Sequence, residues 1–198
     1  ARSLPATNWA AAVLEDLERF DALAVGPGLG DTDEAAAAVA QLIAGSPVPV
    51  VVDADGLRAV ARHPSAAHDA HSTVVLTPHD GEYRRLTGAA PGPDRVAACR
   101  ELAHATGCVV LLKGPTTVVA HPDGNARIVS SGNPRLATAG SGDVLTGIVA
   151  ALVEKSGPLD LVAVAAHWHG RAAEQGANGL VASDLPNLLG AAREAMLS

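Results

Sequence analysis

The sequence predicts an α/β fold in which a mostly parallel sheet is covered by helices on both faces, giving three layers. Four runs rich in Val and Leu alternate with segments in which Ala and Leu recur at helical spacing. In addition, 48% of the residues are hydrophobic but only 2% are aromatic, so the core must be built from Ala, Val and Leu. The four strand-like runs span residues 22–26, 48–53, 74–77 and 108–113.

The second half of the chain follows a different pattern. Two short runs flank the turn-forming sequence PDGN, which predicts a β-hairpin near residues 117–130. Beyond the hairpin, Gly-Pro and Asn-Gly breaks separate three helices, which we expect at residues 142–154, 159–175 and 185–197. Residues 64–72 are expected to form a surface loop.

Length and charge limit the class of protein. The 198 residues, 18% of them charged, suit a single domain spanning residues 1–198. A formal net charge of −7 argues against a nucleic-acid surface or an anionic membrane as partner, because few cations are available to neutralise phosphates. No apolar stretch approaches the ~18 residues of a membrane span, so the expected location is the cytoplasm. Because the chain starts at Ala1 without a methionine, we expect the domain to be incomplete at its amino terminus.

The cysteines and the paired histidines predict neither a disulfide framework nor a zinc site. Cys99 falls in an expected helix and Cys108 at the start of an expected strand, and we interpret both as reduced core residues. His167 and His169 are two residues apart in an expected helix, so their rings should point to opposite sides.

The most informative stretch is ATAGSGDVLTG at residues 137–147. Its small residues allow backbone N–H groups to point into one concavity, and the apolar run that follows predicts a helix beginning there. This arrangement is typical of a phosphate site. Asp143 then lies in the first helical turn, where its carboxylate can take a proton from a hydroxyl that attacks a phosphoryl group. The alternative is that Asp143 only caps the helix.

Two further motifs follow the first two strands. GPGLG at residues 26–30 stands where open α/β sheets bind ligands, although it lacks the full dinucleotide spacing and a tight turn that needs glycine is the alternative. Asp53 and Asp55 end the next strand, and two acidic side chains two residues apart would suit Mg²⁺ or its waters. A helix cap at Asp55 is the alternative there.

The third and fourth strands also end in polar side chains. TPHDGE at residues 77–82 places His79 and Glu82 near the same sheet edge. KGPTT at residues 113–117 brings a lysine and two hydroxyls to the end of the next strand, without the GxxxxGK[ST] spacing of a P-loop. Because each motif directly follows a strand, all four are expected to open on one edge of the sheet.

Taken in order, GPGLG, DADGL, TPHDGE and ATAGSGDVLTG resemble the motifs of the ADP/ATP-dependent NAD(P)H-hydrate dehydratases, a family of the ribokinase-like superfamily. The resemblance covers nearly the whole chain and includes LLKGPTT at residues 111–117 and AAHWHGRAAE at residues 165–174. It implies a ribokinase-like fold and removal of water from hydrated NADH and NADPH, with ADP or ATP as phosphoryl donor and Mg²⁺ as cofactor. It also implies a homo-oligomer, a homotetramer in relatives, and further strands and a helix before the GPGLG strand.

The same resemblance implies roles for individual residues. Asp143 would be the catalytic base, and would contact the hydrated dinucleotide together with Gly28, Gly30 and His79. The amides of residues 140–142 would form an anion hole. The residues implied to contact the adenine nucleotide are Lys113, Gly114, Pro115, Thr116, Thr117, Gly140, Ser141 and Gly142.

Two other functions compete with this interpretation. A small-molecule kinase of the same superfamily, acting on a vitamin precursor, would use the same Asp143 and anion hole but release a phosphorylated product. TPHDGE favours the dehydratase. The other competitor is a nucleotide-binding module that does not turn over because its first lobe is missing. The choices between ADP and ATP and between NADH and NADPH hydrate stay open.

Overall fold

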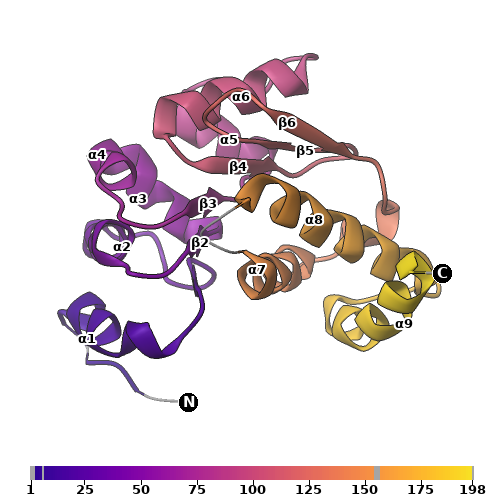
Figure 1. Cartoon of the computed structure of the whole chain (residues 1–198), viewed down its shortest axis with the longest axis horizontal. Coiled ribbons are helices and arrows are strands. Elements are labelled where there is room, and N and C mark those ends of the chain that lie inside the picture. Colours follow the sequence, from indigo (N-terminus) through magenta and orange to yellow (C-terminus); the bar gives the residue numbers. More distant parts are fainter. Residues whose placement is uncertain (1–2, 6, 154–156, 198) are drawn as a thin grey trace.

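A computed structural model, which describes residues 3–5, 7–153 and 157–197, has the expected α/β architecture (Figure 1). Within these residues one six-stranded sheet runs in the order β1-β2-β3-β4-β5-β6. The first four strands pair in parallel, and the last two add an antiparallel hairpin. The strands are β1 (Leu23–Val25), β2 (Val50–Val52), β3 (Val74–Leu76), β4 (Val109–Leu112), β5 (Thr117–Ala120) and β6 (Ala126–Val129).

Helices cover both faces of this sheet (Figure 1). The face covered first along the chain carries α1 (Trp9–Asp16), α2 (Asp33–Gly45), α3 (Leu57–Arg62), α4 (Pro64–His68), α5 (Asp80–Thr87) and α6 (Arg95–Thr106). The opposite face carries α7 (Ser141–Leu152) and α8 (Pro158–Gln175), and α9 (Leu185–Leu197) packs on α8. The short 3₁₀ helices are η1 (Leu17–Arg19), η2 (Ala54–Gly56), η3 (Pro134–Leu136) and η4 (Ala182–Asp184).

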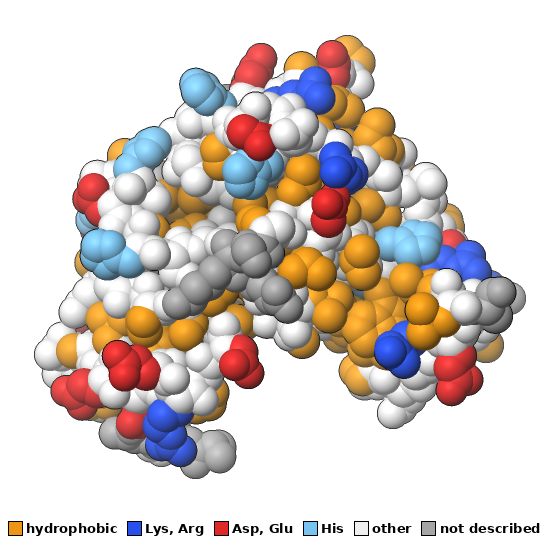
Figure 2. Space-filling model, viewed as in Figure 1, with side chains coloured by type: hydrophobic (Ala, Val, Ile, Leu, Met, Phe, Trp, Pro, Cys, Tyr) orange, Lys and Arg blue, Asp and Glu red, His pale blue; other side chains and the backbone are white. Residues whose placement is uncertain are grey.

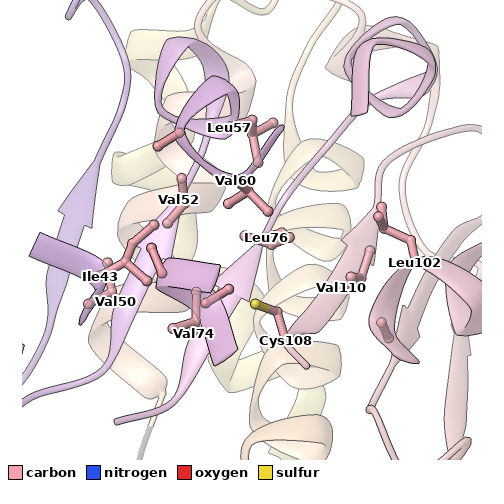
Figure 3. Close-up of a cluster of buried hydrophobic side chains, with 14 of the residues drawn as sticks. Ile43, Val50, Val52, Leu57, Val60, Val74, Leu76, Leu102, Cys108 and Val110 are labelled. Atoms are coloured by element: carbon pink, nitrogen blue, oxygen red, sulfur yellow. The ribbon is translucent and has the colours of Figure 1, made fainter. Parts of the chain in front are cut away.

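Alternation along the strands divides the core into two layers. Val50, Val52 and Leu76 point toward the α1–α6 face, where they contact apolar side chains of α2 and α3 (Figure 3). Val51 and Val75 point the other way and pack against α7 and α8. All three residues of β2 are buried, as expected for an inner strand of a parallel sheet covered on both sides. These two layers of side chains confirm the predicted three-layer arrangement.

The parallel strands bring the sequence motifs to one edge of the sheet. The register pairs Val25 with Val52, and Val52 with Leu76, so β1, β2 and β3 end level with one another. The hairpin returns to the same edge, because Thr117 at the start of β5 pairs with Val129 at the end of β6. The loops after β1 to β4 and the segment leading to α7 therefore all start at this edge, as the sequence predicted.

One element differs from expectation. Part of the expected surface loop at residues 64–72 is helix α4, so that prediction was wrong. Pro64 occupies the first turn, where its missing N–H costs nothing, and Ala66 and Ala67 are buried against the core. Burial of two small side chains is enough to hold a turn of helix that carries no long apolar run.

The remaining elements agree with the sequence. The hairpin is confirmed, with its turn at residues 122–125. Helix α7 begins at Ser141 and ends at Leu152, and residue 154, where it was expected to end, lies outside the described residues. None of the described helices combines the length and the apolar character that a membrane span requires.

Both cysteines are confirmed as buried free thiols. Burial raises the pKa of Cys99 to about 11 and that of Cys108 to about 12. Because the thiolate is the reactive form, these side chains are chemically inert in the folded protein.

Candidate active site

The glycine loop after β1 combines close packing with open space. A Cβ on Gly26 would lie 1.8 Å from the carbonyl oxygen of Asp53, and one on Gly56 would lie 2.9 Å from the Gly26 Cα. The loops after β1 and β2 therefore touch through their backbones, and Gly26 is the glycine that the turn requires. Gly28 and Gly30 have φ values of 74° and 80°, yet no atom lies within 4 Å of where their Cβ would be. The space beside these two glycines remains open to a ligand.

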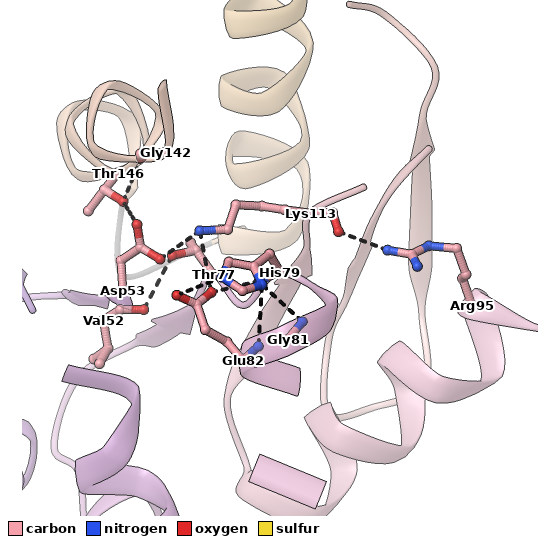
Figure 4. A network of polar contacts seen from close by, with 10 residues as sticks. All are labelled: Val52, Asp53, Thr77, His79, Gly81, Glu82, Arg95, Lys113, Gly142 and Thr146. Carbon is pink, nitrogen blue, oxygen red and sulfur yellow. Dashed lines mark hydrogen bonds and ion pairs between the residues drawn. The ribbon is translucent and has the colours of Figure 1, made fainter. Parts of the chain in front are cut away.

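A buried ion cluster joins the ends of two strands and two helices (Figure 4). Asp53, at the end of β2, is 1% exposed, and its Oδ1 lies 2.8 Å from the Nζ of Lys113, which follows β4. Its Oδ2 accepts a hydrogen bond of 2.8 Å from the Thr146 hydroxyl of α7. Glu82 of α5 adds a second carboxylate 3.7 Å from the Lys113 Nζ. The ammonium group is thus fixed, and it faces Gly142, whose Cβ position is 3.4 Å away.

His79 organises the start of α5. Its Nδ1 accepts hydrogen bonds from the amides of Gly81 at 2.9 Å and Glu82 at 3.3 Å, and a Glu82 carboxylate oxygen accepts from the His79 amide at 2.8 Å. This reciprocal pair is a capping box, with histidine in the place that serine or threonine usually holds. Because Nδ1 is an acceptor, the neutral ring carries its proton on Nε2. The side chain stays 54% exposed, so the ring is oriented and still accessible.

The amino terminus of α7 offers amide groups next to an exposed carboxylate. Gly140 is the N-cap residue, with φ at 86°, and Ser141 donates its amide hydrogen to the Thr138 carbonyl at 3.3 Å. Across the part of the chain that the structure describes, the amides of Gly140 and Gly142 have no hydrogen-bond acceptor. The expected three-amide anion hole is therefore reduced to two free N–H groups. Asp143 is exposed and does not cap the helix, so the capping alternative is wrong.

The turn after β4 is covered by an arginine from α6. Arg95 donates to the Lys113 carbonyl oxygen at 2.8 Å and to the Asp80 carboxylate at 2.8 Å. Its guanidinium would collide with a Cβ on Gly114, at 2.4 Å. Residues 115–117 continue from this turn into β5, with Pro115 and Thr116 exposed. Asp80 thus fixes the arginine that shapes the turn.

The two aspartates proposed for magnesium do not share a face. Both oxygens of Asp53 accept bonds inside the ion cluster, whereas Asp55 lies in η2 and its Oδ2 accepts from the Gly30 amide at 2.9 Å. Asp55 is therefore not a helix cap either; it holds the glycine loop. Within the described residues, no group of three or more His, Cys, Asp or Glu side chains is placed to hold a metal ion. A contribution of these aspartates through magnesium-bound water stays a prediction.

The segment between β6 and α7 is held on α8. Ser131 donates its hydroxyl hydrogen to the His167 carbonyl at 3.1 Å, and the Gly132 amide donates to Glu174 at 2.8 Å. A Cβ on Gly170 would lie 2.5 Å from the Ser131 hydroxyl oxygen, so only glycine allows this approach. Helix α8 therefore fixes the chain that leads into the glycine turn.

His169 of α8 is buried beneath this turn. Burial lowers its pKa to about 4, a hydrogen bond with the Ser141 backbone opposes the shift, and the charge of Lys113 adds to it. Among the described residues its Nε2 has no hydrogen-bond partner. The ring is thus neutral at neutral pH and supports the first residue of α7.

Three residues of this arrangement escaped sequence reasoning. Thr146 carried a usable signal, since it stands four residues after Gly142 and so lies on the same face of the helix. Arg95 meets Asp80 across 15 residues and two helices, with no local signal. The sequence indicated only that the rings of His167 and His169 point to opposite sides of a helix. It did not indicate that His169 is the one of the two that is buried.

These elements define a ribokinase-like protein: a mostly parallel sheet whose strand ends face the glycine-led start of a helix. A ribokinase-like superfamily protein from Enterococcus faecalis shares this fold, with a TM-score of 0.76 and 23% identity over 93% of this chain and 66% of that chain. Within that class, the NAD(P)H-hydrate dehydratase family matches residues 2–193, and the chain belongs to this family.

Individual relatives agree with this assignment. A bifunctional NAD(P)H-hydrate repair enzyme, Nnr, from Mycobacterium tuberculosis is 51% identical over 140 residues, which are 71% of this chain and 29% of the relative. The ADP/ATP-dependent NAD(P)H-hydrate dehydratase from Bacillus subtilis, co-crystallised with ATP and Mg²⁺, superposes with a TM-score of 0.79 at 33% identity, over 88% of this chain and 64% of that chain. The chain spans about a third of the length of the curated relatives that it matches.

Proposed function

We propose that the chain catalyses the ADP- or ATP-dependent dehydration of hydrated NADH and NADPH, a hydro-lyase reaction that restores the reduced dinucleotide. The observation that carries the proposal is the placement of the exposed Asp143 side chain, which makes no hydrogen bond within the described residues, beside the free amides of Gly140 and Gly142. The family assignment supplies the substrate class.

The chemistry needs a better leaving group than hydroxide. Asp143 takes the proton of the ring hydroxyl while that oxygen attacks the terminal phosphorus of the nucleotide, and the bond from this phosphorus to the bridging oxygen breaks. The ring nitrogen lone pair then expels phosphate by breaking the ring carbon–oxygen bond. Loss of a proton from the neighbouring ring carbon restores the double bond. The products are the reduced dinucleotide, inorganic phosphate, and AMP or ADP.

The donor nucleotide is assigned to the space between residues 113–117 and the start of α7. Two free amides, the positive end of the helix and the fixed ammonium of Lys113 favour an anion there. The lysine is already held by Asp53 and Glu82, so no ordering of that long side chain is needed when a phosphate binds.

The side chains suit a Mg²⁺ that is held mainly by nucleotide phosphates and water. Asp53 is fully hydrogen-bonded and Asp55 holds the glycine loop, so these carboxylates can contribute through water rather than by direct coordination. When bound, the ion neutralises charge on the phosphates. Residues of the chain carry out the positioning and the proton transfer.

We place this activity in the cytoplasm and in a homo-oligomer. Figure 2 shows the molecule hollowed between α1 and α9, with hydrophobic side chains along the α7–α9 side of the hollow. Several large apolar side chains are exposed, among them Phe20 at 55% and Val181 at 49%. Light scattering should give a mass well above that of one 19.8 kDa chain; a monomer at working concentration contradicts the oligomer.

Turnover of hydrated NADH tests the function directly. The hydrate is mixed with the protein, Mg²⁺ and ADP or ATP, and the return of reduced-nicotinamide absorbance is followed against a control without nucleotide. Recovery in step with phosphate release supports the dehydratase. A stable phosphorylated product indicates a kinase, and ATP binding without either product indicates a nucleotide-binding module.

A further inference from the structure

A second cleft lies beside the candidate active site, between α3 and α5. It has a volume of about 530 Å³, within the range of ligand-binding pockets. Arg58, Ala61 and Arg62 line it from α3, at the spacing of one helix face, and Arg85 lines it from α5. Three guanidinium groups therefore border one concavity on the α1–α6 side of the sheet.

Two acidic residues line the cleft and also make contacts in the candidate active site. Glu82 lines it and also holds the His79 amide, and its carboxylate lies 3.7 Å from the Lys113 ammonium (Figure 4). Asp55 lines it and also accepts from the Gly30 amide. The cleft therefore borders both the glycine loop and the ion cluster.

The arginines are available to an anion. Arg58 pairs with Asp31, which also lines the cleft, and Arg62 pairs with Asp33; these aspartates are 71% and 88% exposed, and an ion pair with so exposed a partner contributes little. Within the described part of the chain Arg85 makes no ion pair. A bound phosphate carries more charge than an aspartate and accepts paired hydrogen bonds from a guanidinium, so it can replace the aspartates as partner.

We propose that this cleft binds the adenosine half of the dinucleotide substrate, with Arg58, Arg62 and Arg85 contacting its phosphate groups. The inference rests on the proposed function for the identity of the substrate. The reacting ring would lie at Asp143, and the remainder of the dinucleotide would pass Gly30 and extend between α3 and α5. The phosphoryl donor, at Lys113 and Gly142, would occupy a separate position on the other side of the ion cluster.

Equilibrium binding tests the inference independently of turnover. The probe is NADPH, titrated into the 198-residue chain and into Arg58→Gln, Arg85→Gln and the double variant. Each lost charged contact should raise the Kd for NADPH about tenfold or more, while the Kd for ATP stays unchanged. The matched control is Arg84→Gln, because Arg84 is an exposed neighbour on α5 that does not line the cleft.

A truncated ligand makes the test specific. Reduced nicotinamide riboside lacks the adenosine half and every phosphate group, so its Kd should not respond to the arginine variants. An effect on NADPH alone assigns the arginines to the 2′-phosphate, and an equal effect on NADH assigns them to the diphosphate; both support the proposal. It is overturned if NADPH does not bind, if its Kd is unchanged in the double variant, or if ATP affinity falls equally. A failure of the proposed function appears separately, as absent turnover of the hydrate.

Discussion

Replacing Asp53 with asparagine removes one charge from the buried ion cluster while keeping the side-chain shape. Asp53 has a side chain only 2% exposed and holds Lys113, 19% exposed, at 2.8 Å. Breaking a buried pair by removing one partner typically costs about 3–5 kcal/mol. Here Glu82 remains 3.7 Å from the ammonium and some solvent reaches it, so we expect the free energy of unfolding to fall by about 2–3 kcal/mol.

Urea unfolding followed by circular dichroism measures the free energy of unfolding of the variant and of the wild type. In a thermal scan, the melting temperature of the variant should be lower by about 5–10 °C for a domain of this size. The matched comparison is Lys113→Met, alone and combined with Asp53→Asn, because removing both charges should restore about 1–3 kcal/mol relative to the sum of the single changes. A loss below about 0.5 kcal/mol in Asp53→Asn, or strict additivity in the double variant, would show that Asp53 and Lys113 do not form a stabilising buried pair.

Gly142→Val should abolish ATP binding, because a Cβ there lies 3.4 Å from the Lys113 Nζ and the branches would fill the space assigned to phosphate; unchanged affinity by calorimetry argues for another nucleotide site. His169 has a pKa lowered to about 4 from 6.5, so its contribution to stability is complete above pH 6.5 and is lost as the pH falls toward 4. Wild-type should therefore lose about 2 kcal/mol more than His169→Gln between about pH 7 and about pH 5, and parallel losses in urea midpoints contradict this. Cys99 and Cys108, with pKa values of about 11 and about 12, should react with a thiol reagent only at the rate of unfolding, and rapid labelling of native protein would contradict their burial.

The sequence predicted the sheet well because its strands are buried on both faces. A strand such as VVV at residues 50–52 is apolar at every position only where helices cover both faces of the sheet, and the motifs that follow parallel strands of this kind must then share an edge. Helix α4 was missed because its stability comes from burial of Ala66 and Ala67, not from a periodic pattern. Helix α4 therefore forms because of tertiary packing, which a local sequence pattern does not reveal.

The sequence predicted that the candidate site residues share one edge of the sheet, but it did not predict their contacts with one another. Lys113 was assigned to nucleotide and Asp53 to magnesium, and nothing local indicates that the two meet across 60 residues. They come from strands separated by β3, so their pairing depends on side-chain length and direction over a whole strand. The glycines after β1 show the same limit of sequence analysis. The sequence predicts a turn there, but only the structure shows that Gly26 packs against the backbone of Asp53 whereas the space beside Gly28 is open.

The most direct test of the account is the turnover rate of Asp143→Asn with hydrated NADH and the donor nucleotide that the wild-type chain uses. Asp143 is exposed and makes no side-chain hydrogen bond within the described residues, so the variant should keep its unfolding free energy and its affinities for ATP and NADPH. If Asp143 takes the proton of the ring hydroxyl, kcat should fall by about 10²–10⁴-fold, the usual contribution of general base catalysis. Turnover near the wild-type rate in the folded variant would contradict the assignment of Asp143 as the base.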